Sequence, residues 1–370
     1  MAEIRILHRL RDIARQEWNA CFPGELEDYD YLLATEEAGI SGFAWRYVIA
    51  SQLGVVCAAM PFFLTDYALD TTLDGTAKKI TTALRATWPR ALTLKLACLG
   101  SPTTDAGKIG FHPSLGDEKK SALLQDMLAA FEAHAVTQGY RLLGLKDIPT
   151  VDYALLDAVS EPLGYRAVTG LPVAHLPIDF ADFDAYLATL SASTRKDMRR
   201  KLKAREGLRI EERTNIDDVL PSVIELYRQT RARADMQFED LTPSFFHDVL
   251  TGMPGRALCM LYFDGDRLLA MNLLLRDGTT LLDKYFCMAS EEGRARNLYF
   301  LSWMTNIDYC LKHGLKRYQS GQAGYENKLR LGSQLTATRM YFRHTNPWVQ
   351  GVLNLVAPFL AADDTNKEAA

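Results

Sequence analysis

The order of predicted secondary-structure elements repeats along the chain, and this repeat limits the folds that the sequence can adopt. In each half, a hairpin and a further strand lead through a loop into an amphipathic helix, which ends at a glycine before another strand. The two helices span residues 119–137, before Gly139, and residues 297–313, before Gly314. The sequence thus predicts two copies of one α/β unit. Two unrelated α/β domains are the alternative, since strand–helix–strand patterns are common.

The length and the turns are consistent with this organisation. A chain of 370 residues suits two domains of average size. In the second half, Asp-Gly turns at 264–266 and 277–278 separate strand-like runs at 257–263, 267–276 and 280–288. Such turns favour tight hairpins, so these three runs are predicted to form one antiparallel meander.

Composition excludes several classes of function. The net charge of −4 provides no overall field that would attract DNA or a membrane surface. The six cysteines form no C-x-x-C pair and the seven histidines show no metal-ligand spacing, so we expect reduced thiols and no metal site. The sequence has no apolar window near the ~18 residues of a membrane span and no signal-peptide pattern, so we expect a cytoplasmic protein.

A basic stretch lies just past the middle of the chain. Seven of the twelve residues from 194 to 205 are Lys or Arg. If this stretch is helical, Arg195 and Arg199 lie on one face with Arg200 beside them, and guanidinium groups pair well with phosphate. A solvated basic face, or a brace to carboxylates of the other domain, is the alternative.

We place the domain boundaries around this stretch. The predicted divisions are an N-terminal domain at 1–178, a basic helical junction at 179–206, a C-terminal domain at 207–346, and a C-terminal helix with a disordered tail at 347–370.

Two segments resemble a known family. Residues 190–200, Leu-Ser-Ala-Ser-Thr-Arg-Lys-Asp-Met-Arg-Arg, are similar to the Leu-Ser-x-x-x-Arg-x-x-x-Arg-Arg junction of tandem GNAT-fold relatives of the Fem-type peptidoglycan aminoacyltransferases. Residues 321–328, Gly-Gln-Ala-Gly-Tyr-Glu-Asn-Lys, resemble the family's glycine-containing loop before a Lys-bearing helix. The resemblance implies two GNAT-like domains with mixed α/β sheets, joined by a basic helix, over roughly residues 1–345.

The resemblance also implies where a donor would bind. In GNAT folds, a Gln/Arg-x-x-Gly-x-Gly/Ala loop holds diphosphate at a helix N-terminus. Residues 290–295 read Ser-Glu-Glu-Gly-Arg-Ala, so the loop lacks the usual first side chain and carries two acidic residues. With the basic stretch, the predicted donor-binding residues are Arg195, Arg199, Arg200, Gly293, Arg294, Ala295, Arg296, Ser320 and Gln322.

Four residues are the predicted catalytic candidates. By resemblance, Tyr325 is a general acid, and Lys328 holds a developing negative charge or an acceptor carboxylate. Half-buried packing of the tyrosine and an exposed lysine are the alternatives. Asp283 and Tyr285 interrupt an apolar strand, which suggests a role in orienting an amine. Strand alternation would place Lys284 on the face opposite to both.

The family resemblance implies an enzyme that transfers an acyl group from acyl-CoA to a primary amine, with no tightly bound cofactor. The first alternative is Fem-like transfer from aminoacyl-tRNA to an amine of a peptide, a cell-wall precursor or a small molecule, in which tRNA is a partner. The second is a pair of GNAT folds without activity, used as a binding module.

Overall fold

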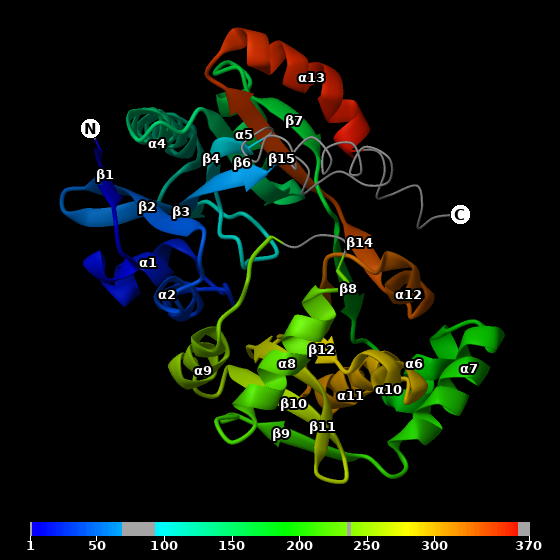
Figure 1. The fold of residues 1–370 in the computed structure, drawn as a ribbon. Coiled ribbons are helices and arrows are strands. Elements are labelled where there is room, and N and C mark those ends of the chain that lie inside the picture. The colour runs from blue at the N-terminus through cyan, green and yellow to red at the C-terminus, as the bar shows by residue number, and fades with distance from the viewer. Residues whose placement is uncertain (1, 69–92, 235–237, 362–370) are drawn as a thin grey trace.

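The computed structural model describes residues 2–68, 93–234 and 238–361, and it contains two mixed sheets (Figure 1). Sheet A has the order β1 (Glu3–Leu7), β2 (Phe43–Gln52), β3 (Val55–Ala68), β4 (Thr93–Leu99), β6 (Leu142–Pro149), β15 (Thr338–His344) and β7 (Arg166–Thr169), with β5 (Gly110–Phe111) paired to β3. Sheet B has the order β14 (Gln334–Thr336), β8 (Val173–Pro177), β13 (Arg317–Gly321), β12 (Thr280–Met288), β11 (Arg267–Arg276), β10 (Ala257–Asp264) and β9 (Arg209–Arg213).

The predicted repeat is present in both sheets. Each sheet contains one parallel pair, β4 with β6 and β12 with β13, and each pair is connected through a long helix. These helices are α4 (Asp117–Thr137) and α11 (Leu298–His313), and Gly314 ends α11 with a left-handed φ of 66°. The remaining α-helices are α1 (Arg15–Cys21), α2 (Tyr29–Glu37), α5 (Tyr153–Ser160), α6 (Phe183–Thr189), α7 (Ala192–Leu202), α8 (Leu220–Arg231), α9 (Pro243–Gly252), α10 (Ser290–Ala295), α12 (Tyr325–Arg330) and α13 (Pro347–Ala361).

The two halves of the chain exchange strands. β8 comes from the first half but lies in sheet B between β14 and β13, whereas β15 comes from the end of the chain and lies in sheet A between β6 and β7. The chain therefore crosses between the sheets at 170–172 and again at Ala337, and Figure 1 shows the two crossings side by side. The domain boundaries remain predictions. β8, which lies before the expected boundary at residue 178, pairs with β13, which lies after it.

The basic stretch does not join the sheets as the family resemblance implied. It forms α7, and the chain has already entered sheet B at β8 before it reaches this helix. α7 therefore packs within the C-terminal unit, against α11. The position of α7 differs from the expectation because β8 pairs with β13. The chain therefore passes from sheet A to sheet B before it reaches the basic residues.

One hydrophobic core extends across both units. It includes Trp18 and Tyr31 from α1 and α2 together with the apolar side chains of sheet B, and the ring of Tyr31 meets the ring of Phe245 on α9 edge-on. A second core lies between sheet A and α4. Because burying apolar surface is the main source of stability, the shared core fixes the two units relative to one another.

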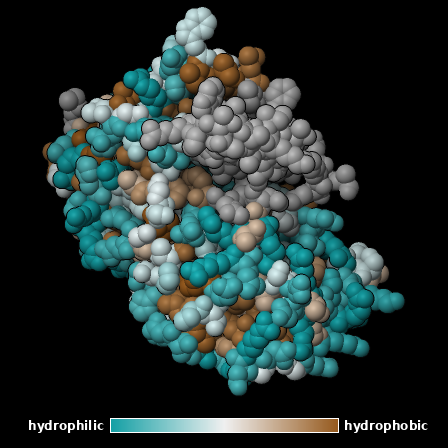
Figure 2. Space-filling model, in the orientation of Figure 1, coloured by the Kyte–Doolittle hydropathy of each residue, from teal (hydrophilic) through white to brown (hydrophobic). Residues whose placement is uncertain are grey.

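The last described helix, α13, covers β7 and β15 and leaves an apolar face exposed. Trp348, Val352 and Leu355 are each more than half exposed, and Figure 2 shows hydrophobic residues gathered over this helix at the top of the view. Within the ranges that the structure describes, we find no helix whose length and apolar character would let it cross a bilayer.

Candidate functional site

The parallel pair in the middle of each sheet separates before its strands end. β4 and β6 pair from Leu96 with Leu142 to Leu99 with Leu145, although β6 continues to Pro149. In sheet B, the pairing of β12 with β13 stops at Leu282 and Gln319, although β12 continues to Met288. In each sheet, one central strand therefore continues beyond the end of its parallel ladder, which leaves an opening beside it.

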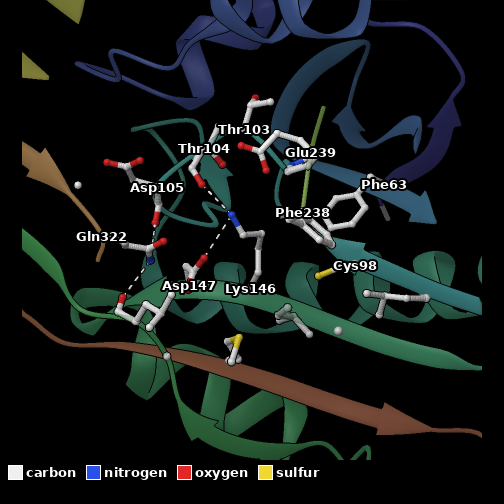
Figure 3. A pocket seen from close by; sticks show the side chains of 18 of the residues that line it. Phe63, Cys98, Thr103, Thr104, Asp105, Lys146, Asp147, Phe238, Glu239 and Gln322 are labelled. Atoms are coloured by element: carbon white, nitrogen blue, oxygen red, sulfur yellow. Dashed lines mark hydrogen bonds and ion pairs between the residues drawn. The ribbon is translucent and has the colours of Figure 1, made fainter. Parts of the chain in front are cut away.

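One cavity of about 550 Å³ lies between these two openings (Figure 3). Its walls come from both units, namely the loop 102–105 and residues 142–147 of sheet A, and residues 283–285 and 320–322 of sheet B. Its size is in the range that encloses a small molecule or one end of a larger one. The shared cavity is therefore the candidate active site.

A β-bulge sets the directions of the side chains on β12. In the ladder with β11, Leu274 pairs with Asp283 and Leu273 pairs with Tyr285, so that Lys284 is an inserted residue. A bulge breaks the alternation of side chains, and Asp283 and Tyr285 consequently point to opposite faces. The expectation that Lys284 lies opposite to both was wrong. Lys284 contacts Glu27 of the N-terminal unit, and Tyr285 contacts Phe245 of α9, whose ring meets Tyr31 of that unit.

Asp283 is a buried carboxylate in a polar network with α11. Tyr318 donates its hydroxyl hydrogen to Asp283 Oδ2 at 2.7 Å, and Asn306 Nδ2 donates to Tyr318 at 3.0 Å and to Asp283 at 3.4 Å. Burial raises the pKa of Asp283, and the hydrogen bond from Tyr318 opposes this shift only in part. A carboxylate whose pKa is raised is a stronger base than an ordinary aspartate, which suits it to accept a proton.

Tyr285 lies on the opposite side of β12. Its hydroxyl donates to Glu239 Oε1 at 3.2 Å, and its ring packs against Phe245 and Phe246 of α9. Burial raises the pKa of Tyr285 well above its ordinary value, so the hydroxyl stays protonated at neutral pH. Its single hydroxyl hydrogen is donated to Glu239, so toward a ligand the hydroxyl oxygen can accept a hydrogen bond.

Lys284 connects the two units inside this wall. Its ammonium group pairs with Glu27 and with Asp105 at 3.2 Å, and it donates to the Thr103 carbonyl oxygen at 2.9 Å. The side chain is 2% exposed. Burial alone would lower the pKa of Lys284, but Asp105 and Glu27 outweigh this effect and raise it well above its ordinary value. Lys284 is therefore a permanent cation between two N-terminal carboxylates.

Two further lysines hold the loops at the openings. In sheet A, Lys146 donates to the carbonyl oxygens of Ser101 at 3.1 Å and Thr104 at 2.7 Å, and lies 3.2 Å from Asp147 (Figure 3). In sheet B, Lys328 donates to the three carbonyl oxygens of residues 320–322, at 2.6, 3.2 and 2.9 Å. Both lysines thus direct their N–H groups to the loops that form the cavity walls.

The structure places the four predicted catalytic residues in two groups. Asp283 and Tyr285 line the cavity. Tyr325 and Lys328 are 4% and 6% exposed and lie behind the wall, where Tyr325 donates to the Pro172 carbonyl oxygen at 2.8 Å. The contacts of Tyr325 and Lys328 support the loop from Ser320 to Gln322 from behind.

Two of the predicted donor-binding residues line the cavity, and the others do not. Ser320 and Gln322 line the cavity, whereas residues 293–296 lie elsewhere, in and directly after α10. Two amides in this segment are already bonded, since Gly293 N donates to Ala289 O at 3.0 Å and Arg296 N donates to Glu292 O at 2.9 Å. The Arg296 side chain pairs with Asp264. These amides are thus engaged within the helix instead of facing a diphosphate.

Arg195, Arg199 and Arg200 lie on α7, outside the walls of the cavity. Arg195 donates to the Ala188 carbonyl oxygen at 3.2 Å, and the side chains of Arg199 and Arg200 are 61% and 77% exposed. Asp197 binds Arg200, Lys201 and Arg330, which connects α7 to α12. Burial acts to raise the pKa of Asp197, but its hydrogen bonds with these three cations lower it to about 2.

Sequence reasoning missed several residues of the site: Glu27, Asp105, Lys146, Asp147 and Glu239. Lys146 and Asp147 are charged residues in an otherwise apolar strand. The same sequence feature made Asp283 a candidate, so it could also have identified this pair. Glu27 and Asp105 lie in loops and have no comparable local signal, because Lys284 brings them together from a distant part of the chain. In the described part of the chain, no cluster of three or more His, Cys, Asp or Glu side chains has the arrangement of a metal site.

Comparison with known proteins agrees with this architecture. A family model described as FemAB-like, peptidoglycan biosynthesis/recognition, matches residues 153–369, which is more than half of the chain. No sequence match among curated proteins reaches significance.

Solved structures are similar over nearly the whole chain. FemX is 15% identical and has a TM-score of 0.59, with 95% of this chain and 100% of FemX covered. A tandem GNAT protein from the clavulanic acid biosynthesis pathway is 14% identical, with a TM-score of 0.55 and coverage of 94% and 99%. The C-terminal domain of a putative lysylphosphatidylglycerol synthetase from Agrobacterium fabrum is 11% identical, with a TM-score of 0.52 and coverage of 93% and 96%. At these identities the similarity shows the fold alone, and it confirms the predicted tandem GNAT-like arrangement.

Proposed function

Because this chain belongs to the FemAB-like family of peptidoglycan biosynthesis and recognition proteins, we propose that it transfers an acyl or aminoacyl group to a primary amine in the cavity between its two sheets. One observation carries this proposal: the central parallel pairs of both sheets separate toward one shared cavity. An opening of this kind exposes backbone hydrogen-bonding groups that a linear acyl arm can engage. The second unit supplies the facing wall for the acceptor.

Asp283 is the proposed general base. An ammonium group is not nucleophilic, so the acceptor must lose a proton before or while it attacks the acyl carbonyl carbon. The ammonium group first releases one proton to solvent. The amine then attacks, the new C–N bond forms, and the bond from the carbonyl carbon to the carrier sulfur or oxygen breaks. The second amine proton passes to Asp283, which then gives it to the leaving sulfur or oxygen. The raised pKa of Asp283 and its hydrogen bond from Tyr318 at 2.7 Å support this role.

Other residues have proposed roles in positioning. Tyr285 presents a protonated hydroxyl that is already oriented by Glu239. Tyr325 and Lys328 hold the loop that carries Gln322, and their contacts favour support of the cavity wall over direct contact with a substrate. A rigid wall matters because a displacement of about 1 Å can cost 100-fold in rate.

For the donor, the geometry favours an aminoacyl group carried on tRNA. The amides of Gly293 and Arg296 are already bonded, and Glu291 and Glu292 place two acidic side chains in the first turn of α10, which disfavours the diphosphate of coenzyme A there. By contrast, α7 presents exposed arginines to solvent. Exposed guanidinium groups bind the phosphate backbone of a nucleic acid through charge. Acyl-CoA remains the second candidate, supported by the openings in the two sheets.

A donor panel tests the proposal. The protein is incubated with a mixture of primary amines and either charged tRNA or a set of acyl-CoAs, and products are identified by mass spectrometry. Transfer from one donor class, lost in Asp283→Asn but retained in Glu132→Gln, is the expected result. Glu132 is a matched control, because it is a mostly buried, ion-paired carboxylate on α4 outside the cavity. Full activity of Asp283→Asn would exclude this residue as the base.

A further inference from the structure

Asp147, at the end of β6, has a backbone conformation that is unfavourable for its residue type. Its φ angle is 48°, in the left-handed region that residues with a Cβ atom rarely adopt. Aspartate tolerates this region better than most residues, but glycine adopts it without cost. Strained backbone at a cavity is a recognised indication of a functional constraint.

The second copy of the unit has a glycine at the corresponding place. The last parallel pair in sheet A is Leu99 with Leu145, and Asp147 follows two residues later. The last parallel pair in sheet B is Leu282 with Gln319, and Gly321 follows two residues later with a φ of 69°. The two positions thus share one backbone conformation, and only the first copy combines it with a carboxylate.

This carboxylate is buried in the cavity wall with little compensation. Its side chain is 8% exposed, and Oδ2 forms an ion pair with Lys146 Nζ at 3.2 Å. Lys146 also donates to two loop carbonyl oxygens, so its charge is shared. Among the residues that the structure describes, no N–H or O–H group donates a hydrogen bond to Asp147 Oδ1. Asp147 lines the cavity, so a donor group of a ligand could bind this oxygen.

Each of the other carboxylates of the cavity accepts at least one hydrogen bond from a side chain. Asp105 accepts hydrogen bonds from Lys284 and Gln319, Glu239 accepts from Tyr285, and Asp283 accepts from Tyr318. The neighbouring buried ionic groups do not balance. The described carboxylates at or beside the cavity wall are Glu27, Asp105, Asp147, Glu239 and Asp283, and they outnumber the lysines there, which are Lys146, Lys284 and Lys328.

We propose that Asp147 is the specificity-determining residue that binds a primary ammonium group of the substrate. This inference rests on the proposed function, because it names the chemical class of the acceptor: a primary amine that enters the cavity as a cation. An ammonium group supplies three N–H donors, which satisfy Oδ1 and neutralise the excess negative charge. A neutral ligand of the same shape, such as an alcohol, has neither the three N–H donors nor the positive charge.

The test compares a cation with its neutral isostere. Binding of n-pentylammonium and of n-pentanol to the full-length protein is measured by calorimetric titration and by ligand-observed NMR at neutral pH. The wild-type protein is expected to bind n-pentylammonium at least tenfold more tightly than n-pentanol. Asp147→Asn, which keeps the shape and tolerates the left-handed backbone, is expected to remove this preference without weakening n-pentanol binding.

Glu132→Gln is the matched control and is expected to leave the preference unchanged, since Glu132 is also a buried, ion-paired carboxylate of the same unit but does not line the cavity. An unchanged preference in Asp147→Asn, or no preference in the wild-type protein, would overturn the inference.

The binding test separates this inference from the proposed function. Selective ammonium binding that depends on Asp147, without transfer from any acyl donor, would support the site and reject the transferase. Transfer that is unaffected by Asp147→Asn, together with unchanged binding, would support the transferase and reject Asp147 as the ammonium site.

Discussion

Lys284 of sheet B and Asp105 of the N-terminal unit lie 3.2 Å apart, across the boundary between the two sheets. Their contact, together with Glu27, places one cation between two carboxylates in a buried wall of the cavity. The ion pair therefore connects the loop that carries Asp105 to the bulge on β12.

Replacing this cation is predicted to destabilise the protein strongly. Lys284→Met leaves Glu27 and Asp105 buried without their partner, which typically costs about 3–5 kcal/mol. Urea denaturation should show this loss. Lys312→Met is the matched control, because it removes an ion pair with Asp308 on the surface of α11, where such pairs contribute about 0.5 kcal/mol. Equal losses in the two variants would contradict the role of Lys284.

Asp283→Asn is predicted to affect stability and activity in opposite directions. Because burial raises the folded-state pKa of Asp283 above its ordinary value of 3.8, its contribution to stability is fully present below pH 3.8 and is lost as the pH rises through the raised pKa. The Asn variant lacks this loss, so its unfolding free energy relative to wild type should improve from pH 4 to pH 7.

The same substitution should lower transfer by about 10²–10⁴-fold, the usual contribution of a general base. In the wild-type protein, kcat/KM should rise with pH through the raised pKa of Asp283. A pH profile with its acidic limb near the ordinary value of 3.8 would show that another group accepts the proton.

The exposed arginines of α7 are predicted to act through charge alone. If α7 contacts tRNA, Arg199→Ala should weaken binding of charged tRNA and reduce the slope of log K against log salt by about 1. Thermal stability should change little, since the Arg199 side chain is 61% exposed. Lys312→Ala, an exposed cation on α11, serves as the control, and an equal effect there would show only nonspecific attraction.

The loop over the opening of sheet A is predicted to tolerate no side chain at Gly107. A Cβ atom at Gly107 would lie 2.1 Å from the carbonyl oxygen of Lys146, so Gly107→Ala must displace the backbone beside the cavity. Such overpacking typically costs about 1–3 kcal/mol. Gly116→Ala is the control because nothing lies within 4 Å of its Cβ position. Thermal unfolding of the two variants should differ clearly.

The sequence was sufficient to predict the repeated unit because its signals are local. Helical periodicity and the glycine at 314 set α11, and Asp-Gly turns set the hairpins before it. The family motifs at 190–200 and 321–328 led to the fold that the comparisons confirm.

The remainder depends on contacts between distant parts of the chain. The bulge at Lys284 reverses the direction of the Tyr285 side chain. The sequence of β12 gives no signal of this bulge, because the bulge depends on the pairing with β11 and on the buried partners of Lys284. The usual alternation of side chains along a strand therefore predicted the wrong face for Lys284 relative to Tyr285. Likewise, Glu27 becomes part of the site only through a partner 257 positions away.

The exchange of β8 and β15 has a consequence for biosynthesis. Sheet A receives β15 from residues 338–344, so β6 and β7 of the N-terminal half cannot complete their ladders until these residues have left the ribosome. Until β15 has been synthesised, the strand edges of β6 and β7 that pair with it remain unpaired. Unpaired strand edges can associate with other chains. Nascent chains stalled upstream of residue 338 should accordingly require chaperone protection that the released protein does not.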